Sequence, residues 1–503
     1  MDTLPLERVS VPAGERSQPP SRRSGKTLLL FAVLLPALLA FTGLIIDGGL
    51  LMAAQRHAQH VADAAATAAA LEKHRGESDS TAAAAATNLV HAHNGLPDAQ
   101  VVVNIPPAQG PYAGRSGYVE VVLAHDVPTY LMQVLGAASS STVRAQAVAG
   151  YEPSTAGAAI VVLDPDPPPL SVSPIPPLLP AAPALLGGFE VLGQGELRVE
   201  AAVLVNTQWG GVDQNGDPAG DGPGPPYAIA CTPLLPLTQL RALDIRVVGG
   251  VDNPNNYGHI SPQQDSPLKA NKLPVPDPFR NLPPPTLTTD PSNVRADIYG
   301  GVTVANLPLA PPRVLQPGVY DWIEVISGRV IFSPGIYVIR GANPLTQAAL
   351  SIVGGNVTAQ GVMFYITNSP AYSINDGSPD SLDGETAPPA PGAAALLPSV
   401  ILNLSLLNST FSPLNDPTSP FHGMTIYQRR RDRRPIIILR EDLLLAGSFS
   451  GTAYAKWGHV ILAGSGTFDA RFVAGTMRVV NATNVTLAPG TLLPPAEDVF
   501  LVQ

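Results

Sequence analysis

The chain has 503 residues, of which 14% are charged and 55 are proline, and its net charge at pH 7 is −10. This acidic balance argues against a protein that binds nucleic acid over a broad basic surface. The single cysteine, Cys231, excludes an intramolecular disulfide framework and a cysteine-based zinc cluster, and we expect it to be a small buried residue. The length is enough for roughly two to four domains with a substantial core.

Residues 1–26 are polar and contain proline without any periodic apolar positions, which predicts a disordered tail. The segment that follows, Thr27–Ile46, has twenty residues and no charge. A helix of that length spans about 30 Å, the thickness of the hydrocarbon core of a bilayer, and a membrane helix can tolerate Pro36. A cleaved signal peptide would have an apolar core of only about 7–15 residues. The segment therefore predicts a single uncleaved transmembrane anchor rather than a signal peptide or a buried core helix.

The charges on the two sides of this segment predict its orientation. Arg22, Arg23 and Lys26 precede it, whereas Asp47 follows it. Basic residues are retained on the cytoplasmic side of a membrane. We therefore expect the N-terminus in the cytoplasm and the bulk of the chain outside the cytoplasmic (inner) membrane, in a periplasmic or extracellular position.

After the anchor, alanine-rich sequence predicts that the helix continues outside the membrane. Nothing in Leu50–Lys73 breaks a helix, and alanine is the best helix former. Alanines at three- and four-residue steps form a face onto which a helix of another protein is expected to pack: Ala58, Ala62, Ala65 and Ala69. A second helix is expected from an N-cap at Ser80 to Asn94, so that residues 27–95 form one N-terminal region.

Residues 23–71 resemble the N-terminal segment of the TadG-like proteins of Flp/Tad pilus assembly. In that family, an arginine and a glycine precede an apolar run, an aspartate–glycine step and an alanine-rich stretch. The matching residues in this sequence are Arg23, Gly25, Asp47, Gly48, Gln59, Ala62, Asp63 and Ala64 to Ala66. The resemblance implies a part in assembling or anchoring a Tad-type pilus, and hence in adhesion or secretion, with other pilus-assembly or pseudopilin-like proteins as partners of the N-terminal helix. Related pseudopilins carry glutamate five residues after the glycine at which they are cleaved, and that position is Leu30 here.

The pattern then changes from helical to strand-like. Runs at 101–105, 118–124 and 143–152, with a short helix between the last two, predict a small α+β neck over residues 96–152. Residues 153–186 are rich in proline, which forbids a membrane helix there and favours a stiff, extended connector.

Residues 187–503 are dominated by short β-runs separated by glycine, with loop excursions rich in proline, glycine, aspartate and asparagine. The fragments PGVY and PGIY begin seventeen residues apart, at Pro317 and Pro334. Short strands at a period near twenty residues are typical of stacked rungs, each of which buries its apolar face against its neighbours. We therefore expect a parallel β-helix (solenoid), with a β-sandwich as the alternative. The predicted fold class is α+β: one transmembrane helix, a small neck and a large all-β region.

One loop of this region has the spacing of a calcium site. Side chains that carry oxygen occupy its first, third, fifth and ninth positions: Asp213, Asn215, Asp217 and Asp221. Pro218 replaces the usual glycine at the sixth position, and no glutamate follows at the twelfth, so an ordinary Asx turn is the alternative. Apart from calcium, the sequence suggests no cofactor.

No motif predicts catalysis. A serine-hydrolase elbow, a P-loop, a zinc-protease helix and a dinucleotide fingerprint are all absent. The acidic residues that could serve a β-helix enzyme are scattered and form no evident pair: Asp297, Asp321, Glu324, Glu441, Asp442 and Asp469. The dense basic run over 429–434 favours a solvated loop, with binding of an anionic envelope polymer or of an acidic partner surface as the alternatives.

These patterns predict a non-enzymatic, membrane-anchored envelope protein that does not bind nucleic acid. The membrane and envelope polysaccharide are the partners that these patterns suggest, and the resemblance to TadG-like proteins implies other pilus-assembly proteins as well. The alternatives are an anchored β-helix enzyme that acts on carbohydrate and an adhesin that binds glycans.

Overall fold

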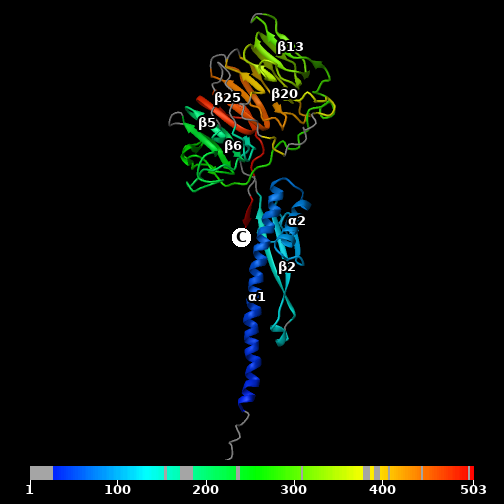
Figure 1. The fold of residues 1–503 in the computed structure, drawn as a ribbon, viewed down its shortest axis with the longest axis vertical. Helices are drawn as coiled ribbons and strands as arrows, with labels where there is room; N and C mark the ends of the chain where they lie inside the picture. The colour runs from blue at the N-terminus through cyan, green and yellow to red at the C-terminus, as the bar shows by residue number, and fades with distance from the viewer. Residues whose placement is uncertain are drawn as a thin grey trace, which may run out of the picture.

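The structure is a computed structural model that describes residues 26–503, apart from 137, 152–155, 170–184, 234–237, 308–309, 378–385, 390–396, 406–407, 443–445, 497–498 and 503. A long helix has a small sheet alongside it, and a large β-rich region lies beyond both along the long axis of the molecule (Figure 1). The tail predicted for residues 1–26 lies outside the described residues, except for the residue at which the helix begins.

Helix α1, Lys26–His74, is 49 residues long and runs without interruption through the predicted anchor and its alanine-rich extension. At 1.5 Å per residue it is about 74 Å long. Pro36 lies inside the helix and does not end it. A Schellman motif ends it: Gly76 has a φ of 78°, and the amides of Gly76 and Glu77 donate to carbonyls of the last turn. The expected continuation of the helix over Leu50–Lys73 is therefore confirmed.

A short second helix packs beside α1. This helix, α2, spans Asp79–Asn88 and continues into a π-helical turn, η1, at Leu89–His93. Its N-cap is Ser78, whose hydroxyl accepts the amide of Thr81 at 3.2 Å. The expectation of an N-cap at Ser80 is wrong. The first-turn amide of Thr81 has no carbonyl acceptor within the helix, and Ser78, three residues before it, supplies the acceptor.

A small antiparallel sheet completes the neck, in the strand order β1–β2–β3–β26. Its strands are β1 Gln100–Asn104, β2 Tyr118–Pro128, β3 Ser140–Gly150 and β26 Phe500–Val502. The connection between β2 and β3 contains a 3-10 turn, η2, at Met132–Leu135. Strand β26 comes from the end of the chain, and its Leu501 pairs with Ala149. Together with α2 and the second half of α1, this sheet forms the neck, to which the chain returns after passing through the β-rich region.

Parallel pairing builds the β-rich region, which we call the β-region. Between 298 and 487 the described strands form three ladders, and strands that follow one another in the chain belong to the three ladders in turn. The first ladder contains β11 Ile298–Tyr299, β14 Gly318–Tyr320, β17 Gly335–Ile339, β20 Val362–Ile366 and β23 Met424–Gln428. The second contains β12 Val302–Ala305, β15 Ile323–Ser327, β18 Leu350–Ile352, β21 Val400–Asn403 and β24 Ile436–Arg440. The third contains β13 Arg313–Leu315, β16 Arg329–Phe332, β19 Asn356–Ala359 and β22 Thr410–Phe411.

The last strand of each ladder pairs with a different part of β25, Ser448–Leu487. Further strands continue the stack beyond β25. These are β4 Ala158–Val162, β5 Gly187–Gly193, β6 Glu196–Val205, β7 Tyr227–Pro233, β8 Gln239–Val247, β9 Tyr257–His259 and β10 Leu268–Lys269. Strand β25 pairs in parallel with β4, β5 and β6, so the first strands of the region stack on its last. Strand β4, within the predicted connector 153–186, therefore belongs to the β-region, while residues 170–184 lie outside the described residues.

The core of the β-region has two layers. One cluster of buried apolar side chains joins strands of all three ladders, and Cys231 is buried in it as expected. A second apolar cluster lies on the outer face of the first ladder. Segment 270–297, which joins β10 to β11, covers this face with Phe279 and Leu282, packed against a cluster that includes Tyr454. The segment thus replaces water on a face that would otherwise be an exposed apolar sheet.

Candidate functional site

The first half of α1 exposes its apolar side chains. Leu28, Val33 and Phe41 are 79%, 70% and 64% exposed. Apolar surface left in water is unfavourable by about 25 cal/mol per Å², which a lipid environment would remove. The helix is long and apolar enough to cross a membrane, a property that single-pass anchors share with signal sequences. This half of α1 is therefore a membrane-capable surface.

The charges predicted to flank the anchor have different surroundings. Arg22 and Arg23 lie outside the described residues, and Lys26 is the first residue of α1. Asp47, expected as a charge on the outer flank, is only 1% exposed. Its burial shows a structural role that the charge pattern did not reveal.

Asp47 holds the connection between β2 and β3. Its Oδ2 accepts the backbone amides of Tyr130, Leu131 and Met132 at 3.1, 2.8 and 2.7 Å. Hydrogen bonds to a charged acceptor contribute about 1.5–3 kcal/mol each. Beside it, Gly43 lies against the same turn, since a Cβ on Gly43 would be 2.8 Å from the Leu131 Cβ. Asp47 thus links the β2–β3 connection to α1 at the end of the apolar run. The sequence signal for this contact was a carboxylate placed directly after that run.

The alanine face of α1 is covered by the chain itself. All four alanines singled out by their spacing are buried: Ala58, Ala62, Ala65 and Ala69. They form one cluster with Ala82 and Ala86 of α2 and with Val121 and Ala145 of the neck sheet. The close packing predicted by the alanine spacing is present, but the expectation that another protein occupies this face is corrected. Small side chains here let the chain's own sheet and α2 approach the helix.

Two glutamines beside this face fix α1 to β3. Gln55 Nε2 donates to the carbonyl of Arg144 at 2.7 Å, and Gln59 Nε2 donates to the carbonyl of Gln146 at 2.9 Å. Gln59 Nε2 also donates to Asp63 Oδ1 at 2.9 Å. Gln59 and Asp63 belong to the alanine-rich motif, so the motif supplies both the small face and the polar groups that hold the neck sheet.

The predicted calcium loop is a turn in which the first carboxylate binds the backbone. Asp213 Oδ1 accepts the amides of Asn215 and Asp217 at 2.8 and 2.9 Å. Asp221 lies farther along, where its amide donates to the carbonyl of Gln208 at 3.1 Å. Across the part of the chain that the structure describes, no group of three or more histidine, cysteine, aspartate or glutamate side chains is placed to hold a metal ion. Calcium binding by this loop stays a prediction.

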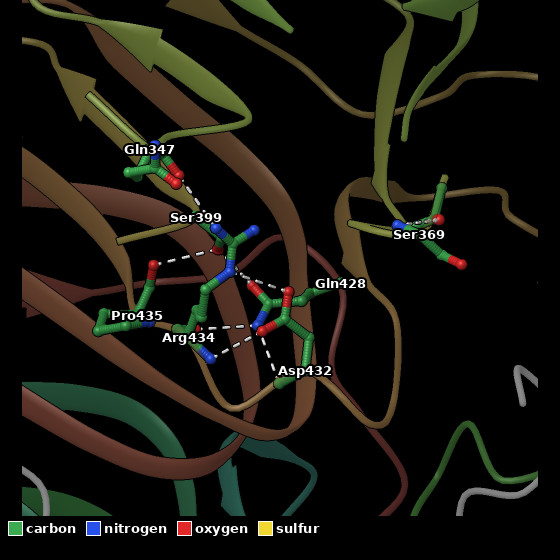
Figure 2. A network of polar contacts seen from close by, with 8 residues as sticks. Gln347, Ser369, Ser399, Gln428, Asp432, Arg434 and Pro435 are labelled. Atoms are coloured by element: carbon green, nitrogen blue, oxygen red, sulfur yellow. Dashed lines mark hydrogen bonds and ion pairs between the residues drawn. The ribbon is translucent and has the colours of Figure 1, made fainter. Parts of the chain in front are cut away.

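The basic run over 429–434 forms the turn between β23 and β24, and polar contacts order it (Figure 2). Gln428 Nε2 donates to the carbonyls of Asp432 and Arg434, both at 2.9 Å. Ser399 Oγ donates to Gln428 Oε1 at 2.8 Å. The glutamine thus closes the turn from one side and links it to the chain just before β21.

Two arginines of this run are buried. Arg430 is 2% exposed and donates to the carbonyls of Phe279 and Leu282 at 2.6 and 2.9 Å. Arg433 is 8% exposed, and its Nη1 lies 2.6 Å from Asp164 Oδ2. Burial raises the pKa of Asp164, and the arginine partly opposes that rise. The expectation of a solvated loop is wrong for these two residues, because they join the turn to segment 270–297 and to the chain after β4. Neither is available to bind an anionic polymer.

Three of the six carboxylates considered for catalysis have partners that fix the local structure. Asp321 pairs with Arg340 at 2.8 Å, and Glu324 accepts a hydrogen bond from Asn343 at 2.9 Å. Asp469 accepts a backbone amide at 2.7 Å. These contacts give each of the three carboxylates a role in fixing a loop or a strand end.

The match to a known family concerns helix α1. No curated protein and no solved structure matches the chain. Residues 25–72 match the family described as putative Flp pilus-assembly TadE/G-like. The match spans nearly all of α1 and includes Asp47 and Gln59, which bind the β2–β3 connection and β3, and Asp63, which accepts a hydrogen bond from Gln59. The resemblance predicted for residues 23–71 is confirmed by this match, so residues 25–72 are similar to the TadE/G-like Flp pilus-assembly family.

Proposed function

We propose that the chain is a non-enzymatic, single-pass envelope protein that takes part in assembling or anchoring a Flp/Tad-type pilus. In this arrangement α1 crosses the cytoplasmic membrane, residues 1–26 are cytoplasmic, and the neck and β-region lie outside. The observation that carries the proposal is the position of the TadE/G-like segment. It coincides with a helix whose first half is apolar and exposed and whose second half is built into the neck.

Charge supports the proposed orientation. Arg22, Arg23 and Lys26 precede the apolar run, and basic residues are retained on the cytoplasmic side. Asp47, after the run, is held by backbone amides of the neck. The neck therefore belongs on the side of the membrane opposite the basic residues.

The strand connectivity supports a passive, rigid outer part. We infer that the three ladders wind as a parallel β-helix, because each strand pairs with the strand three elements later, as β14 does with β17 and β17 with β20. A β-sandwich would pair its strands mainly antiparallel. The first strand of the region, β4, stacks on its last, β25, and the chain then returns to the neck as β26. A body with both chain ends at the neck is suited to being carried on a stalk.

The lack of catalytic activity is part of the proposal. Its support is that Asp321, Glu324 and Asp469 each make structural contacts. The full chain should release neither reducing ends nor unsaturated products from a panel of neutral and uronate-containing polysaccharides. Turnover that disappears in a Glu324→Gln variant would overturn this part of the proposal.

Topology is tested first, with a tag at the N-terminus and a second tag in the β-region. In spheroplasts, added protease should remove the tag in the β-region and leave the N-terminal tag intact. Protection of the β-region would show the reverse orientation. Resistance of the chain to alkaline carbonate extraction should separate an integral anchor from a cleaved signal.

The role in pilus assembly is tested by complementation of a strain that lacks the chain. The full chain should restore surface pili, counted by electron microscopy. A variant whose residues 1–46 are replaced by a cleavable signal peptide should be exported but should not restore pili. A matched control replaces Thr27–Ile46 with an unrelated apolar helix of equal length, which tests anchoring without the native apolar sequence. Normal piliation in the strain that lacks the chain would overturn the proposal.

A further inference from the structure

We propose that the tip of the β2–β3 hairpin, Thr129–Gln133, lies in the bilayer beside α1 and binds lipid. We call this segment the neck tip. The inference rests on the proposed function, in which Thr27–Ile46 crosses the membrane. The hairpin runs along α1 toward the apolar half of the helix (Figure 1). A segment 83–85 residues beyond Asp47 in the chain thereby makes a second contact with the membrane.

The depth of the neck tip follows from its contacts with α1. Leu131 packs on Gly43, where an added Cβ would be 2.8 Å from the Leu131 Cβ. Gly43 precedes Ile46, the last residue of the apolar run, by three residues, or about 4.5 Å along the helix axis. A side chain in contact with Gly43 has to share its depth. Leu131 therefore lies nearer the centre of the bilayer than Ile46, the last residue of the apolar run. The turn around Leu131 is at the level of the lipid headgroups or closer to the bilayer centre.

The composition of the neck tip suits this position. No residue from Val127 to Val143 is charged, although Asp126 and Arg144 stand on either side. Tyr130 is 64% exposed, and tyrosine is enriched at membrane–water interfaces because its ring is apolar and its hydroxyl is polar. An uncharged hairpin end with an exposed tyrosine is unfavourable in water and favourable among lipid headgroups.

Four backbone amides of the neck tip, those of residues 129–132, donate to acceptors within the chain. The three central amides of the neck tip donate to Asp47. The amide of Thr129 donates to the carbonyl of Ser139 at 3.0 Å, and its hydroxyl donates to the carbonyl of Ala138 at 2.5 Å. The side chain of Gln133 donates to the carbonyl of Thr129. Backbone groups in contact with hydrocarbon cannot bind water, so internal pairing of this kind is what a membrane-embedded turn needs.

Lipid is the occupant because the exposed side of the neck tip continues the exposed apolar surface of α1 at the same depth. A single helix could rotate and tilt in the bilayer. A helix joined to an embedded hairpin has two points of contact, which fix the rotation of the neck. The β-region is then presented at a defined angle to the membrane.

The test places a fluorophore that senses its surroundings, nitrobenzoxadiazole, on single cysteines of the full chain in nanodiscs, with lipids brominated on their acyl chains as the quencher. Cys231 is buried, so the wild-type chain gives the labelling background. The three variants are Leu38→Cys in the anchor, Tyr130→Cys in the neck tip and Val102→Cys on β1. Val102 is a matched control, since it is apolar and 53% exposed on the same sheet. It pairs with Val122, which is about 20 Å along β2 from Pro128, two residues before Tyr130.

Brominated lipids should remove most of the emission at Leu38→Cys and Tyr130→Cys and leave that at Val102→Cys unchanged. Quenching at Leu38→Cys without quenching at Tyr130→Cys would overturn the lipid contact and leave the anchor intact. A label at Tyr130→Cys that is shielded from water but not quenched would overturn it in favour of a protein contact. Absence of quenching at Leu38→Cys would refute the anchor, and with it the proposed function.

Discussion

Ala65 allows a direct test of how the neck is held together. It is fully buried in the cluster between α1, α2 and the neck sheet. Replacement by leucine leaves helix propensity nearly unchanged, so an effect on stability reports the packing. The adjacent Ala64 is exposed, and Ala64→Leu is therefore a control with the same change on the same helix.

The expected size of the effect follows from the lack of free space. Leucine adds three carbon atoms at a position where Ala65, Ala62 and Ala69 are all fully buried. Overfilling a close-packed core typically costs about 1–3 kcal/mol. A loss of that size raises the population of the open neck by roughly 5- to 150-fold. Ala64→Leu should leave the stability of the neck within about 0.5 kcal/mol of the wild type.

Hydrogen–deuterium exchange of the full chain in nanodiscs measures this stability locally. Buried amides of β2, such as those of Val119 and Val121, exchange through opening of the neck. Ala65→Leu should speed their exchange by the factor above, while strands of the β-region such as β20 keep their protection. Equal exchange of β2 in the wild type, Ala64→Leu and Ala65→Leu would refute the tight packing of α1 on the sheet.

Three further predictions concern the β-region. Glu190 and Arg478 form a buried pair, Oε2 to Nε 2.5 Å, where β5 meets β25. Glu190→Gln should lower the free energy of unfolding in denaturant by about 3–5 kcal/mol, whereas Glu200→Gln, in an exposed pair with Arg198, should change it by less than about 1 kcal/mol; equal effects would contradict the burial. Burial and the nearby Arg478 lower the pKa of His459 to about 3. In the unfolded chain His459 takes up a proton near pH 6.5, whereas in the folded chain it stays neutral. The free energy of unfolding should therefore fall by about 2 kcal/mol from pH 7 to pH 5, and this fall should be absent in His459→Gln. The same fall in both proteins would contradict the burial of a neutral His459. Calorimetry should detect calcium binding at millimolar levels in the wild type but not in the Asp213→Ala, Asp217→Ala double variant, and equal heats would remove the site.

Much of the local structure could be predicted from the sequence because its causes are local. Twenty uncharged residues followed by an alanine-rich run predict one long helix, and the positive φ at Gly76 ends it where the run ends. Glycine-separated β-runs predict a strand-rich region, and from β11 to β22 each described strand pairs in parallel with the strand three elements later. The stacking of β4, β5 and β6 on β25 does not follow the order of the runs. The spacing of Asp47, Gln59 and Asp63 identifies the TadE/G-like segment, because family motifs are read along a single stretch of chain.

The tertiary structure decided which surfaces meet, because contacts between distant residues leave no periodic pattern. The alanine face requires only small neighbours, so its spacing could not tell the chain's own sheet from another protein. The amides that bind Asp47 come from a turn 83–85 residues away, and Arg433 binds Asp164 across 269 residues. Strand β26 is too short for any sequence signal, yet its pairing with β3 returns the chain to the neck. The sequence by itself determined the long helix, the strand-rich region and the resemblance of the N-terminal segment to the TadE/G-like family. Only the fold decided that Asp47, the alanine face and the two buried arginines serve the chain's own packing. The reason is that burial depends on what the rest of the chain places around a residue.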